Sequence, residues 1–75
     1  GENRELGFMV AGEYEFTPEQ CWCFVLIAGE IDVMLPGETE YKTYLPDQDF
    51  IVDPGKTFKA LVKEGQFCDF EICIW

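Results

Sequence analysis

Short apolar segments separated by turn signals dominate this sequence, and no window repeats its apolar residues at a helical period. The clearest segment is residues 30–35, which read Glu-Ile-Asp-Val-Met-Leu. Such alternation places apolar side chains on one face of a strand and leaves the other face in water. Pro36-Gly37 and Asp53-Pro54-Gly55 are turn signals, because proline cannot donate to a sheet ladder and glycine permits positive φ. The pattern predicts an all-β protein.

Seven or eight strands are predicted, over residues 6–10, 13–16, 21–28, 31–35, 41–45, 50–52, 57–62 and 67–75. Residues 21–28 form the longest apolar run, which predicts a strand buried on both faces and ending in a hairpin corner at Gly29. Lys63-Glu64-Gly65 is predicted as the turn before the last strand. Strands this short and evenly spaced fit a sandwich or a barrel, and closure into a barrel hides strand edges. We expect one domain over residues 1–75.

The charge balance excludes several partners. Fifteen acidic residues against five basic ones give a formal net charge of −10. Binding to nucleic acid or to anionic lipid depends on lysine and arginine, so neither partner is expected. The apolar runs are too short to cross a bilayer, which needs about 20 residues. Residues 1–5 lack the features of a signal peptide, so we expect a soluble, cytoplasmic protein.

Four cysteines and the absence of histidine bear on metal binding. Cys21 and Cys23 share one face of a strand, whereas Cys68 and Cys73 are expected on opposite faces of the last strand, Cys68 toward the core. This spacing does not fit a tetrahedral site, and reduced thiols are expected. Imidazole ligands are excluded, and no metal or other cofactor is predicted. The acidic residues leave a hard-cation site open.

The segment GFMVAGEYEF at residues 7–16 resembles the G-x-M-x-x-G-E-Y-x-F segment of the pyrimidine/purine nucleoside phosphorylase family. The likeness continues through IAGEIDVMLP at residues 27–36, where the family reads S-G-x-L-x-V-L-L-P, and through residues 50–52 and 72–73. The resemblance implies a small cupin-like (RmlC-like) β-barrel or jelly roll of antiparallel strands. Family members usually begin with additional strands, so part of the sheet is expected to be missing or supplied by a partner. Pairing of one strand with a second subunit hides a strand edge as closure does, so we expect a homodimer.

The resemblance implies phosphorolysis, in which phosphate attacks the sugar of a nucleoside and releases the base and a sugar 1-phosphate. Such a site needs a cation for phosphate, a carboxylate near the ribose and a proton donor for the base. Arg4 is the best candidate for phosphate, because its fork suits oxyanions. Glu13 is the candidate for the ribose hydroxyls, and Tyr14 for stacking on the base or donating a proton.

Each candidate has a plainer interpretation. Arg4 can be a solvated terminal arginine, Tyr14 a core residue, and Glu13 a cap after Gly12. Trp22, Phe24 and Trp75 can line a cavity for the base, or can simply fill the core. The alternative function is a non-enzymatic barrel that binds a small ligand or forms an oligomer. A site in which cations and carboxylates converge favours the enzyme, and one lined by aromatic and acidic residues favours the binding protein.

Overall fold

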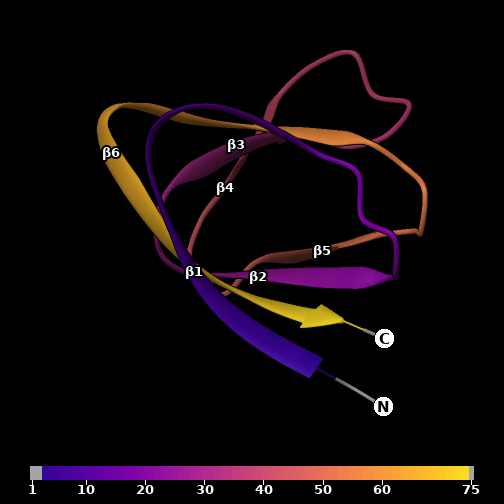
Figure 1. The fold of residues 1–75 in the computed structure, drawn as a ribbon. Helices are drawn as coiled ribbons and strands as arrows, with labels where there is room; N and C mark the ends of the chain where they lie inside the picture. Colours follow the sequence, from indigo (N-terminus) through magenta and orange to yellow (C-terminus); the bar gives the residue numbers. More distant parts are fainter. Residues whose placement is uncertain (1–2, 75) are drawn as a thin grey trace.

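The computed structural model describes residues 3–74, which form six strands and no helix (Figure 1). The strands are β1 (Asn3–Phe16), β2 (Trp22–Gly29), β3 (Ile31–Met34), β4 (Lys42–Tyr44), β5 (Asp49–Val52) and β6 (Phe58–Ile74). All the pairings between them are antiparallel. The predicted all-β class is confirmed. Because no helix occurs in this part of the chain, none is available there to cross a membrane.

Two long strands account for the smaller number of strands. The predicted segments 6–10 and 13–16 are one strand, β1, whose pairing with β6 shifts by three positions between Val10 and Gly12. The segments 57–62 and 67–75 likewise merge into β6, so the turn predicted at residues 63–65 was wrong. Gly65 has a φ of 83°, which bends β6 without ending it. Figure 1 shows β1 and β6 following the same curve.

Strand β6 lies at the centre of the sheet. β1 runs along one edge of β6, and β2 and β3 follow one another along the other edge. β5 pairs with β2, and β4 pairs with β3. The predicted hairpin corner at Gly29 was therefore wrong. β6 and β5 already occupy the two edges of β2, so β3 cannot fold back on it.

The curled sheet wraps around a core of twelve buried residues: Met9, Phe24, Leu26, Ile31, Val33, Phe50, Val52, Phe58, Ala60, Val62, Cys68 and Ile72. The ring of Phe24 stacks between those of Phe50 and Phe70, with centroids 4.8 Å and 4.7 Å away. Phe58 meets both Phe24 and Phe50 edge-on. These side chains fill the space that a larger barrel keeps for a ligand.

The outer face of the sheet is only partly covered. On β2, Phe24 and Leu26 are buried, but Ile27 is 47% exposed, so the prediction that this strand is buried on both faces was wrong. Within the described residues, no second layer packs over this face. The hydrogen-bonded ladder of strands does not close into a ring, since β1, β4 and β5 each pair with a single neighbouring strand among the described residues. Curling of the sheet, rather than full closure of the ladder, encloses the core.

Candidate functional site

A depression of about 490 Å³ lies on the surface over β1, β3 and β6, beside the segment that leads into β4. It is lined by Glu13, Tyr14, Glu15, Met34, Tyr41 and Lys59. Two carboxylates, one ammonium and two phenol rings therefore meet at one place. A larger depression of about 660 Å³ lies over Trp22 and Ile74, but its described lining contains no cation. The smaller depression has the groups that recognise an anion and a sugar, and we take it as the candidate site.

Strand pairing aligns the charged residues of this depression. Lys59 on β6 is directly opposite Glu15 on β1, and on its other side it is opposite Met34 on β3. Glu13 is two residues before Glu15 on β1, so both carboxylates project from one face of the sheet. Within the described part of the chain the Lys59 ammonium makes no ion pair. It is therefore available to an anionic ligand.

Tyr14 has a structural role that the sequence did not indicate. Its hydroxyl donates a hydrogen bond of 2.7 Å to the carbonyl oxygen of Val10, across the irregularity in β1. Its half-buried ring stacks with that of Phe16, with the ring centroids 6.3 Å apart, and packs against the core. The hydroxyl proton is thus already engaged, while the hydroxyl oxygen still has acceptor capacity.

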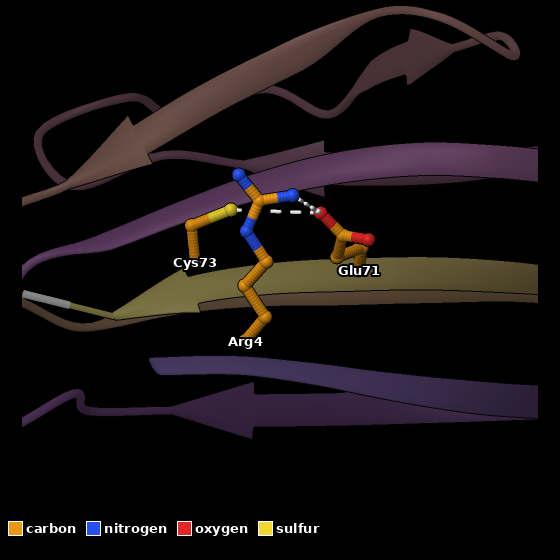
Figure 2. Close-up of polar contacts among 3 residues, drawn as sticks. All are labelled: Arg4, Glu71 and Cys73. Atoms are coloured by element: carbon orange, nitrogen blue, oxygen red, sulfur yellow. Dashed lines mark hydrogen bonds and ion pairs between the residues drawn. The ribbon is translucent and has the colours of Figure 1, made fainter. Parts of the chain in front are cut away.

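Arg4 lies at the other end of β1 and does not line this depression. Its Nη1 is 3.5 Å from Oε1 of Glu71, and 66% of its side chain is exposed. Figure 2 shows the guanidinium reaching over the sheet toward Glu71 and Cys73. The structure therefore brings Glu13 and Tyr14 together but keeps Arg4 apart from them. A substrate contact by any of the three stays a prediction.

Sequence reasoning did not select Lys59, Glu15, Met34 or Tyr41. Lys59 was one of five available cations, but nothing local distinguished it from the other four. Its neighbourhood depends on pairing between strands from opposite ends of the chain. Composition therefore supplied a short list of cations, and the register of the strands selected one of them.

The aromatic residues proposed to line a base cavity have different positions. Phe24 is 1% exposed within the ring stack of the core, so of its two interpretations the structure supports the core and not a cavity lining. Trp22 borders the larger depression, and its ring centroid lies 5.9 Å from that of Phe16. Trp75 lies outside the described residues. Among residues 3–74, no group of three or more cysteine, aspartate or glutamate side chains is arranged to hold a metal ion.

Comparison with solved structures defines the class of protein. A protein of unknown function from Acinetobacter sp. ADP1 superposes with a TM-score of 0.88, over 96% of this chain and 69% of that one, at 22% identity. The polyketide cyclase RemF from Streptomyces resistomycificus superposes with a TM-score of 0.77, over 95% of this chain and 53% of that one, at 16% identity. At these identities the likeness shows the fold alone. The predicted cupin-like fold is confirmed.

Sequence comparison identifies the family. The family model described as pyrimidine/purine nucleoside phosphorylase matches residues 1–70. A pyrimidine/purine nucleoside phosphorylase of Pseudoalteromonas atlantica is 41% identical over 70 residues, which are 91% of this chain and 75% of that protein. One of Clostridioides difficile is 39% identical over 64 residues, or 85% of this chain. The chain belongs to the pyrimidine/purine nucleoside phosphorylase family. It spans 61% of the length of the C. difficile relative.

Proposed function

We propose that this chain carries out phosphorolysis of nucleosides, and that the depression containing Lys59 and Glu13 binds the substrates. An oxygen of phosphate attacks C1′ of the sugar, and the bond from C1′ to the base nitrogen breaks. The base leaves with the bonding electron pair and takes up a proton, and the sugar leaves as its 1-phosphate. Family membership supports the reaction, and the convergence of an ammonium, two carboxylates and two phenol rings supports the site.

The roles follow from charge and shape. The Lys59 ammonium attracts phosphate, since it makes no ion pair within residues 3–74. The Glu13 carboxylate accepts hydrogen bonds from ribose hydroxyls and favours the positive charge that develops on the sugar in the transition state. Tyr41 is 39% exposed, which leaves its ring available to stack on the base. The two carboxylates of this depression favour the positive charge on the sugar and oppose the binding of phosphate. Phosphate binding in this depression therefore depends on the ammonium of Lys59.

The test is phosphate-dependent release of free base from uridine or inosine, with a family enzyme of known activity in parallel. We expect K59Q to lower kcat/KM about a hundredfold through the loss of the phosphate contact, and E13Q to lower it by a similar factor. The matched control is K56Q, because Lys56 is an exposed lysine outside this depression. If no base is released while the parallel enzyme is active, the proposed reaction is wrong. If K59Q and E13Q match the wild type, the site is wrong.

A non-enzymatic binding role is the second candidate, and the same acidic excess supports it. Two carboxylates and two phenols beside one ammonium also suit a neutral or cationic small molecule. Thermal shift assays separate the two functions. Stabilisation by a nucleoside that does not depend on phosphate, with no turnover, favours binding alone.

A second copy of the chain is the partner that the edge of β1 fits. Within residues 3–74, β1 pairs only with β6 and leaves its other edge open. Residues 6–12 carry no charge in a chain of net charge −10, so repulsion between copies is weakest there. Leu6, Phe8 and Val10 are 76%, 58% and 58% exposed. Antiparallel pairing of two β1 strands centred on Phe8 places Leu6 opposite Val10 of the second copy, so that apolar side chains cover one another.

Sedimentation tests this homodimer. We expect a dimer for the wild type and a monomer for F8E, because pairing would place two carboxylates at the two-fold axis. I51E is the matched control, since Ile51 is 59% exposed but lies on β5. A monomeric wild type, or a dimeric F8E, contradicts the pairing. The cytoplasmic location stays a prediction from the sequence.

A further inference from the structure

Three of the four cysteines lie on the outer face of the sheet or beside it. Cys23 on β2 and Cys73 on β6 are direct partners in the antiparallel pairing of these strands, and Cys21 lies just before β2. All three are half-buried, and all four cysteines carry reduced thiols in the structure. Cys68 is separate from this group, since it is fully buried on the inner face as predicted.

The pairing places Cys23 and Cys73 within bonding range. Directly opposed residues of an antiparallel pair have Cα atoms about 4.5 to 5.5 Å apart and side chains on the same face. Disulfides form when the Cα atoms are about 4.4 to 6.8 Å apart and the Cβ atoms do not point away from one another. Cys21 and Cys23 fit less well, because residues two apart on an extended strand are roughly 6.6 Å apart with parallel side chains. The other strand neighbour of Cys23 is Ile51, which offers no sulfur.

Charged groups surround this thiol pair. The Cys73 thiol donates to Oε1 of Glu71 at 3.6 Å, and that same oxygen is 3.5 Å from Nη1 of Arg4 (Figure 2). Cys73 on β6 therefore has two direct strand partners, Cys23 on β2 at one edge and Arg4 on β1 at the other edge. The Glu71 carboxylate opposes negative charge on the Cys73 sulfur during thiol–disulfide exchange, and the Arg4 guanidinium offsets part of that effect. Burial, and then the Asp49 carboxylate, raise the pKa of the Cys23 thiol. Both thiols are only partly buried, so a small reagent can reach them.

We propose that Cys23 and Cys73 are a reversible oxidation site, which forms a cross-strand disulfide by exchange with a low-molecular-weight disulfide. One thiol attacks the small disulfide, which forms a mixed disulfide and releases one small thiol. The second cysteine then displaces the other small thiol and closes the protein disulfide. The two cysteines are oxidised, the small disulfide is reduced, and the two thiol protons leave on the two released thiols. The bond ties β2 to the end of β6 and encloses most of the chain in one loop.

The test is incubation of the purified chain with oxidised glutathione, followed by thiol titration in denaturant, intact mass and peptide mapping. The four reduced thiols should fall to two, and the mass should fall by about 2 Da, for two hydrogens lost with one disulfide formed. Peptide mapping should find Cys23 joined to Cys73. The oxidised protein should melt about 10 °C higher, since a cross-link that closes a long loop restricts the unfolded chain. A reducing agent should reverse each change.

Variants sharpen this test. C23S should leave a glutathione adduct on Cys73, and C73S one on Cys23, whereas the matched control C21S should oxidise like the wild type. Four remaining thiols, a bond that includes Cys21, or disulfides only between chains would overturn the proposal. If C23S or C73S does not fold, the wild-type peptide map alone decides between these outcomes.

Discussion

The Nζ of Lys63 lies 3.5 Å from Oδ2 of Asp32, and the hydroxyl of Thr43 donates to Oδ1 of the same carboxylate at 2.7 Å. These contacts join β6, β3 and β4. The alternation of residues 30–35 predicted that Asp32 lies on the face exposed to water. In the structure its residue is only 6% exposed, and no other charged residue among those described is buried. The neighbouring strands cover the carboxylate and supply the partners that a buried charge needs.

Removing the Asp32 carboxylate should destabilise the protein. We expect D32A to lower the free energy of unfolding by about 2 to 3 kcal/mol, because it leaves Thr43 without its acceptor and opens a small void. K63Q should cost about 0.5 kcal/mol or less, since 57% of the Lys63 side chain is exposed and the pair is screened by solvent. Urea unfolding of both variants measures the difference. Equal losses would show that the ion pair, not the hydrogen bond, is the main contribution.

Gly29 should tolerate no side chain. Its φ is 86°, and a Cβ built there lies 2.0 Å from the carbonyl oxygen of Phe67. G29A should therefore cost more than about 3 kcal/mol and force the end of β2 away from β6. Gly37 is the matched control, with a φ of 84° and open space around it, and G37A should cost about 1 kcal/mol. Thermal melts of the two variants should differ widely, and similar melting temperatures would contradict the steric explanation.

The Tyr14 hydroxyl should contribute to stability as well as to the site. Y14F removes the hydrogen bond to Val10 and keeps the ring, and we expect a loss of about 1 kcal/mol in the free energy of unfolding. Tyr41 makes no hydrogen bond through its hydroxyl within the described residues, so Y41F should change stability by less than about 0.5 kcal/mol. Denaturant titrations of both variants check this contrast. Equal stability of Y14F and wild type would show that the bond across the irregularity in β1 contributes nothing.

Alkaline pH should destabilise the fold. Burial raises the pKa of the Cys68 thiol above its ordinary value of 9.0, despite an opposing backbone hydrogen bond from Met9. Burial also raises the pKa of Tyr44, with a smaller effect from Glu38. As the pH rises past 9.0 the unfolded thiol therefore loses its proton while the native one keeps it, and stability falls.

The free energy of unfolding measured between pH 7 and pH 10.5 checks this expectation. C68A should be less stable than the wild type at neutral pH because of the lost sulfur, but its stability should fall less steeply above about pH 9. Parallel curves for the two proteins would show that Cys68 does not contribute to the alkaline loss.

Local patterns were sufficient where one face of a strand meets the core. Ile31 and Val33 alternate with Asp32 and Met34, and the first two are buried in the structure as predicted. Period two also separated Cys68 from Cys73 correctly. Two of the failures occurred at glycines. Gly65 was interpreted as a turn and Gly29 as a hairpin corner, because a positive φ is common to turns and to bends within a strand.

Alternation and turn residues by themselves determined that this chain is all-β, and the motifs of residues 7–16 and 27–36 carried its resemblance to a cupin-like family. These properties depend on neighbours along the chain, where the geometry of a strand is fixed at two residues per repeat. Only the tertiary structure decided that Lys59 meets Glu15 and that Cys23 meets Cys73. Those relationships depend on the register between distant strands, which the whole packed sheet sets and no local segment encodes.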